Sequence, residues 1–174
     1  LGNLEVFFRD VDVDDSVKWK GEEWIPCNVP YEGVPAALKE FDAVGLNVAF
    51  IGGGAFSFCK SLMTVKFETT SKLSGINYDI SPVSYYETGI ELGTFYGCTA
   101  LNSITLPASL TEIARYSFYG CTALKTIKFS ENATLATIGD YGFYDCPVLY
   151  TADMSNCRDS LAESRQFFIY LQGW

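Results

Sequence analysis

The sequence predicts an α/β-type repeat solenoid, right-handed, with one short parallel sheet and short helical turns on the opposite side. The main observation is the phrase Phe-Tyr-x-Cys, which ends at Cys98, Cys121 and Cys146 and recurs in the looser form Phe-x-x-Cys at Cys59. The last three of these cysteines are separated by 23 and 25 residues, and the first two by 39. A period of this size is typical of solenoids, in which each repeat is one supersecondary unit.

A strand pattern follows each copy of the phrase. In the second copy, Leu101 lies three residues after the cysteine, Ile104 three further on and Leu106 two beyond that. This L-x-x-I-x-L pattern is that of the leucine-rich-repeat strand, and apolar residues two apart turn one face of a strand inward. We therefore expect adjacent parallel strands at residues 62–67, 101–106, 124–129 and 149–154.

The first half of each copy predicts the rest of the repeat. Apolar spacings of four and three, as in Ala55, Cys59 and Leu62, fit a short helical turn. The recurring Phe95, Phe118 and Phe143 should be buried and stacked, with the repeat cysteines as free thiols, because side chains at one position of successive repeats point in parallel. Past the strands, polar side chains should bond the backbone of the neighbouring repeat: Thr70, Ser109, Asn132 and Cys157.

Three segments fall outside this pattern. Residues 1–45 are interpreted as an N-terminal cap, with a hairpin over 17–25 and a short helix over 35–44, and residues 158–174 as a C-terminal cap. The repeats then occupy 46–157. Residues 76–89 lack the Phe-x-x-Cys core, and we interpret them as an insertion or a degraded repeat. Such a segment is either a binding loop or a tolerated insertion without a role.

Charge and composition exclude several functions. A formal net charge of −9 leaves few cations to neutralise the phosphates of nucleic acid or an anionic membrane surface. The chain has no histidine, which removes imidazole-based catalysis and imidazole metal ligands. Asp10, Asp12 and Asp14 begin like a calcium loop, but Asp15 and Gly21 stand where that loop needs glycine and glutamate. We expect neither a metal nor a cofactor.

The solvent side of the predicted strands is the most regular candidate binding surface, because solenoids commonly bind through their sheet. Its residues are short and polar, with two lysines, and a plain solvated sheet is the alternative. They are Thr64, Lys66, Ser103, Thr105, Thr126, Lys128, Thr151 and Asp153. A second candidate is a stripe of Tyr96, Tyr119 and Tyr144, which are either rings packed on the exterior or a platform for a partner or glycan.

The full motif I-x-x-x-x-F-x-x-C-x-x-L-x-x-I-x-L-P, at residues 90–107, resembles the BspA-like leucine-rich repeats of bacterial surface proteins. The resemblance covers residues 46–157 and implies a non-enzymatic, exported or cell-surface module for protein interaction or adhesion. Its partner would be a host matrix or cell-surface protein, or a glycan, and we expect a monomer. The alternatives are a structural spacer of a larger surface protein and a carboxylate-based hydrolase. The hydrolase would use Glu22, Glu23 and the aspartates of the run at residues 10–15. The chain begins at Leu1, which fits a removed signal peptide as well as a fragment.

Overall fold

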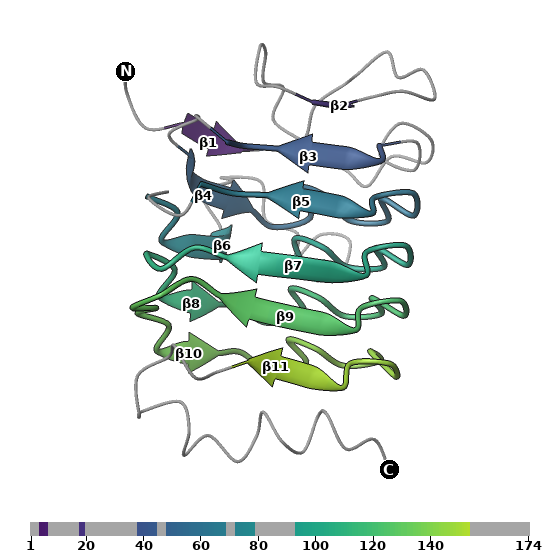
Figure 1. The fold of residues 1–174 in the computed structure, drawn as a ribbon. Helices are drawn as coiled ribbons and strands as arrows, with labels where there is room; N and C mark the ends of the chain where they lie inside the picture. Colours follow the sequence, from purple (N-terminus) through teal and green to yellow (C-terminus); the bar gives the residue numbers. More distant parts are fainter. Residues whose placement is uncertain are drawn as a thin grey trace, which may run out of the picture.

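The structure, a computed structural model, describes residues 4–6, 18–19, 38–44, 48–68, 72–78 and 93–153. In this part of the chain, short parallel strands stack in two columns, so that successive repeats lie one below another (Figure 1). The first column is one five-stranded sheet in the order β1 (Leu4–Val6), β4 (Val48–Gly52), β6 (Gly75–Tyr78), β8 (Glu112–Ile113) and β10 (Thr137–Ile138).

The second column consists of two three-stranded sheets. One has the order β2 (Lys18–Trp19), β3 (Glu40–Asp42) and β5 (Thr64–Lys66), and the other β7 (Ser103–Leu106), β9 (Thr126–Phe129) and β11 (Thr151–Asp153). Strands β5 and β7 lie side by side, so the two sheets continue one stack (Figure 1). The leucine-rich repeat fold and the four predicted strand positions are therefore confirmed, whereas the single sheet is wrong.

The strands form where the sequence alternates. In β7 the side chains of Ile104 and Leu106 are buried and those of Ser103 and Thr105 exposed, and the same alternation holds in β9. The two strands pair in register from Ser103↔Thr126 to Leu106↔Phe129. A strand with one apolar face gains stability only when stacking covers that face, so each repeat depends on its neighbours.

The predicted helical turns are wrong, because the described residues contain strands and tight turns but no helix. The amide of Cys59 donates to the Phe56 carbonyl (3.0 Å), and that of Leu62 to the Cys59 carbonyl (3.1 Å). These i→i+3 bonds reproduce apolar spacings close to helical ones. The left-handed φ of +59° at Phe58 interrupts them, and Gly97 and Gly120 adopt the same conformation before their own cysteines.

The helix predicted within the N-terminal cap, over residues 35–44, is wrong in its described part, because residues 38–44 form a rung of the stack. Glu40–Asp42 pairs with Thr64–Lys66, where a helix over 35–44 was expected, and the other side of β3 pairs in parallel with Lys18–Trp19. The sequence signal was present, since Leu38, Phe41 and Ala43 repeat the spacing of Leu62, Val65 and Phe67 and are buried. Residues 20–25 and 35–37 of these predictions lie outside the described residues.

Of the two interpretations of residues 76–89, a degraded repeat fits the part that is described. Ile76 is buried in β6, in register with Ile51 of β4 and Ile113 of β8, so this position belongs to the stack and not to an insertion. The chain is next described at Gly93, where the turn of that repeat begins. Residues 79–89, Ile90 and the predicted C-terminal cap at 158–174 lie outside the described part.

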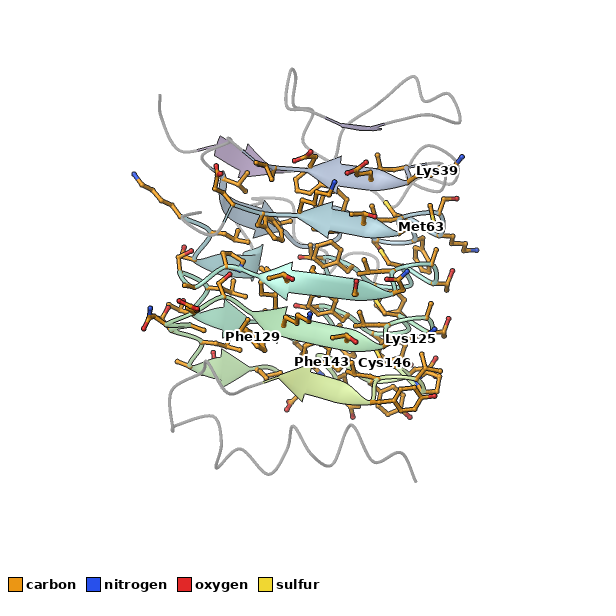
Figure 2. The ribbon with its side chains drawn as sticks, viewed as in Figure 1. Lys39, Met63, Lys125, Phe129, Phe143 and Cys146 are labelled. Atoms are coloured by element: carbon orange, nitrogen blue, oxygen red, sulfur yellow. The ribbon has the colours of Figure 1, made fainter. Side chains whose placement is uncertain are left out.

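A single apolar core runs through the stack between the two columns of strands. Phe56, Phe95, Phe118 and Phe143 are buried, and consecutive rings stack at centroid distances of 5.2, 5.0 and 5.1 Å. Cys59, Cys98, Cys121 and Cys146 are buried free thiols, as predicted. Phe143 and Cys146 lie toward the β11 end of the core (Figure 2).

Past the strands, polar side chains were predicted to bond the backbone of the neighbouring repeat. This prediction is confirmed at one described position and wrong at another. The Ser109 hydroxyl donates to the Leu73 carbonyl of the preceding repeat (2.7 Å). In the next repeat the hydroxyl of Thr134 takes this role toward the Ala108 carbonyl (2.8 Å), because the strand-to-leucine connection is two residues longer there. Asn132 is instead exposed, at φ +60°. Thr70 and Cys157 lie outside the described residues.

Candidate binding surfaces

The solvent-facing side of the second column of strands, which we call the strand face, brings the predicted site residues into two lines. Ser103, Thr126 and Thr151 pair in register along one line, and Thr105, Lys128 and Asp153 along the other. Thr64 and Lys66 stand at the same two positions of β5, where their partners in β3 are Glu40 and Asp42. Lys66, Ser103, Thr105 and Lys128 are exposed, and Thr64 and Thr126 half-buried. The side chains of Thr151 and Asp153 are outside the described part.

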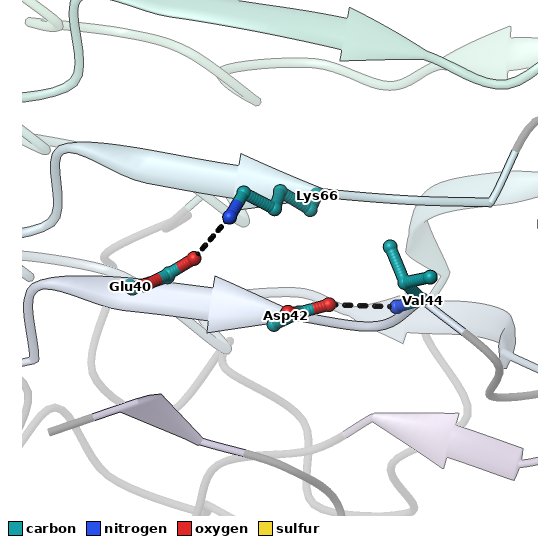
Figure 3. A network of polar contacts seen from close by, with 4 residues as sticks. All are labelled: Glu40, Asp42, Val44 and Lys66. Atoms are coloured by element: carbon teal, nitrogen blue, oxygen red, sulfur yellow. Dashed lines mark hydrogen bonds and ion pairs between the residues drawn. The ribbon is translucent and has the colours of Figure 1, made fainter.

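Lys66 is engaged by a neighbour on this face. Its Nζ lies 2.6 Å from Oε1 of Glu40 on β3, with 46% of the Lys66 side chain and 26% of the Glu40 side chain exposed (Figure 3). Asp42, one step along β3, is buried, and its Oδ1 accepts a hydrogen bond from the Val44 amide (2.9 Å). The charge of Lys66 is therefore partly neutralised by a residue that the sequence analysis had placed in a cap.

Two other lysines of the strand face, one within β9 and one directly before it, face solvent. Lys125 precedes β9 and Lys128 lies within it, and both are exposed. Among the side chains that the structure describes, no carboxylate pairs with either of them. The exposed positive charge of the strand face therefore lies at Lys125 and Lys128, with Asp153 next to Lys128 in register on β11.

A further line of side chains at the beginning of each strand was missed by the sequence analysis. Lys39, Met63 and Lys125 stand one below another at this end of the column (Figure 2). Backbone bonds hold the line together, since the Met63 amide donates to the Lys39 carbonyl (2.9 Å) and the Tyr150 amide to the Lys125 carbonyl (3.3 Å). These side chains could have been found from the sequence, because each one directly follows a repeat leucine. They were missed because this position lies before the two-residue alternation of the strand begins.

The predicted tyrosine stripe is present as a column of stacked rings. Tyr119 stacks on Tyr96 at 4.8 Å and on Tyr144 at 5.2 Å, and Tyr116 stacks on Tyr141 in a second column at 5.2 Å. Burial first, and then the neighbouring phenols and the Asp145 carboxylate, raise the pKa of Tyr119. The second column was not predicted, because its members stand at a position occupied by Gly54 in the first repeat.

The cysteines do not form a reactive site. The thiol of Cys98 donates to the Phe56 carbonyl (3.0 Å), that of Cys121 to the Phe95 carbonyl (3.1 Å), and that of Cys146 to the Phe118 carbonyl (3.2 Å). Burial raises the pKa of Cys98 and Cys121 well above the ordinary value and that of Cys146 to about 12. A thiol held in its protonated form is a poor nucleophile and a poor metal ligand. These cysteines serve to bond one repeat to the previous one.

Within the described ranges, no group of three or more histidine, cysteine, aspartate or glutamate side chains is placed to hold a metal ion. Nor does any segment that the structure describes form an apolar helix of the length required to traverse a bilayer.

The fold and the repeated core together define a leucine-rich repeat protein. Residues 88–168 match the family model described as the BspA type leucine rich repeat region, in six copies. The repeats within residues 88–168 are therefore of this type, which confirms the resemblance seen in the sequence. No curated protein matches the chain.

Several solved structures are similar to the chain at low identity. The leucine-rich repeat protein of T. pallidum is 20% identical, with a TM-score of 0.42, over 67% of this chain and 56% of its own. A leucine-rich repeat protein from Bacteroides ovatus is 19% identical, with a TM-score of 0.39, over 80% of this chain and 38% of its own. A leucine rich cell surface protein from Faecalibacterium prausnitzii is 19% identical, with a TM-score of 0.37, over 87% of this chain and 48% of its own. The chain therefore spans about half the length of these proteins or less.

Proposed function

We propose that this chain is a non-enzymatic, exported or cell-surface module that binds another protein, in adhesion or a related interaction, through its strand face. The family of its repeats supports a protein-binding role. The predicted residues Thr64, Lys66, Ser103, Thr105, Thr126 and Lys128 lie on adjacent strands with exposed or half-buried side chains. Short polar side chains on a rigid sheet lose little conformational entropy when a partner covers them.

The observation that carries this proposal is the position of Lys125 and Lys128. They are exposed and without a described carboxylate partner on a chain whose formal net charge is −9. A local positive patch on an acidic protein steers an acidic partner surface and speeds association, with an effect that weakens as salt is added. Lys66 contributes less to this steering, because Glu40 already holds it.

The test compares two double variants with the same change in charge. Lys125→Glu with Lys128→Glu reverses the patch, and Lys60→Glu with Lys72→Glu reverses two exposed lysines outside the strands. Each protein is applied by surface plasmon resonance to a panel of immobilised host matrix and serum proteins. We expect the strand-face variant to associate at least about tenfold more slowly with any protein that the unmodified chain binds, and the control to keep its rate. Both should keep the melting temperature, since exposed charges contribute little to stability.

An equal loss in both variants would place the effect in net charge and reject the strand face. The main alternative, a structural spacer within a larger surface protein, predicts that the unmodified chain binds no protein of the panel. A glycan array run in parallel addresses the remaining alternative, in which the same face takes a carbohydrate.

A further inference from the structure

A second surface of the molecule is formed by aromatic rings on the turns that contain the repeat cysteines. We call it the tyrosine cluster, and it consists of Phe58, Tyr96, Tyr116, Tyr119, Tyr141 and Tyr144. Its two columns touch each other, with Tyr116 and Tyr119 at a centroid distance of 5.8 Å and Tyr141 and Tyr144 at 5.5 Å. Phe58 closes one end by packing edge-on against Tyr96 at 5.3 Å.

The backbone under three of these rings is strained. Tyr116 and Tyr141 have φ values of +58° and +56°, at the position where the first repeat has Gly54 at +71°. Phe58 has a φ of +59°, at the position where later repeats have Gly97 and Gly120. Glycine adopts this conformation freely, whereas an aromatic residue there costs free energy. Phe58, Tyr141 and Tyr144 lie outside the core, at 42%, 38% and 45% exposed, and Tyr96, Tyr116 and Tyr119 are half-buried at its edge.

Strained residues on a surface are a recognised mark of a functional site. The cluster is also pre-ordered, since its tyrosines stack between successive repeats and Phe58 packs edge-on against Tyr96. Rigid tyrosines offer a large amphipathic contact area at a small entropic cost, and tyrosine and arginine are over-represented among residues that dominate binding energy. Arg115 already places a cation beside this surface, with its guanidinium carbon 4.9 Å from the Tyr116 ring centroid, so a positively charged group of a partner would bind on the side of Tyr141 and Tyr144.

The arrangement of the rings selects the chemistry of the partner. Consecutive rings are nearly parallel, at 2° for Tyr96 and Tyr119 and 6° for Tyr116 and Tyr141, so their faces cover one another. A sugar ring stacks on a free aromatic face, and a column of this kind leaves mainly ring edges and hydroxyls for a ligand. Exposed carboxylates of Asp140 and Asp145 lie on the same turns. We propose that the tyrosine cluster is a second interaction surface, which binds a lysine- or arginine-bearing polypeptide segment through phenol and carboxylate oxygens.

The test uses synthetic peptides of matched length, one rich in lysine and arginine, one acidic and one uncharged, with binding measured by fluorescence anisotropy. The key variant is Tyr116→Gly with Tyr141→Gly, which removes two rings and places glycine where the backbone favours it. We expect it to keep or raise the melting temperature and to bind the basic peptide at least tenfold more weakly. The control is Tyr150→Gly, which removes a tyrosine that is 76% exposed and outside the cluster.

A second variant removes only the hydroxyls, through Tyr119→Phe with Tyr144→Phe, and should weaken basic-peptide binding while the stacked columns stay intact. The proposal is overturned if the glycine variant binds the basic peptide as well as the unmodified chain does. It is equally overturned if Tyr150→Gly loses as much, or if the acidic or uncharged peptide binds as tightly. The strand-face variant Lys125→Glu with Lys128→Glu should retain basic-peptide binding, which separates failure of this surface from failure of the strand face.

Discussion

Replacing Phe118 with alanine tests whether the stacked phenylalanines hold the repeats together. Phe118 is fully buried, and its ring lies 5.0 Å from that of Phe95 and 5.1 Å from that of Phe143. The substitution removes buried apolar surface and leaves a cavity between two repeats that cannot collapse easily. Such changes cost about 3–5 kcal/mol, and the loss of two ring contacts places this one toward the upper end.

The measurement is equilibrium unfolding in urea, where a loss of this size moves the midpoint down by more than ~1 M for a protein of moderate size. Tyr150→Ala serves as the control, because Tyr150 is 76% exposed and its removal should change the stability by less than about 0.5 kcal/mol. A loss below about 1 kcal/mol for Phe118→Ala is the range of a surface change and would refute the stacked core.

Two further predictions concern the thiols and the glycines. An unfolded cysteine has a pKa of about 8.5 and Cys146 in the fold one of about 12, so above pH ~8.5 the unfolded chain releases a proton that the fold retains, and stability falls as pH rises. Cys146→Ala should therefore make the decline shallower by roughly 1.4 kcal/mol per pH unit in urea melts near pH 9–10, and identical slopes would mean that the thiol is not buried. Gly139→Ala places a methyl 2.5 Å from the Arg115 amide nitrogen and should lower the free energy of unfolding by about 1–3 kcal/mol. Gly120→Ala has room, since the nearest atom lies at 3.8 Å, and should lower it by about 1 kcal/mol because of the φ of +70°. The two glycine costs are measured in the same urea assay, and a larger loss at Gly120 than at Gly139 would contradict the close backbone contact.

The sequence predicts best what recurs in register. Phe118 and Cys121 recur with constant spacing to Leu124 and Ile127, and these positions fixed the strands, the core and the reduced thiols. The strand face followed directly, because alternation alone determines which side chains of a short strand point outward.

What escaped prediction depends on contacts between repeats rather than on spacing within one. The ion pair of Lys66 with Glu40 joins residues on different strands, and it could not be foreseen while β3 was interpreted as a helix. The turns imitate helical spacing because their backbone bonds join residues three apart, close to the four of an α-helix. Left-handed residues such as Phe58, Gly97 and Gly120 distinguish them from a helix. The strain at Tyr116 and Tyr141 is likewise invisible in composition, since tyrosine in a turn looks like an ordinary surface residue.

The bonds between repeats also bear on how such a chain changes in evolution. The amide of Phe95 donates to the Ser117 carbonyl of the next repeat, and the carbonyl of Phe95 accepts from the Cys121 thiol of that repeat. Phe118 makes the same pair of bonds with Gly142 and Cys146. Every junction of this type presents the same donors and acceptors to the next one. A recombination event that duplicates or deletes one whole repeat therefore rejoins compatible surfaces, and array length can vary between relatives without any compensating substitution in the core.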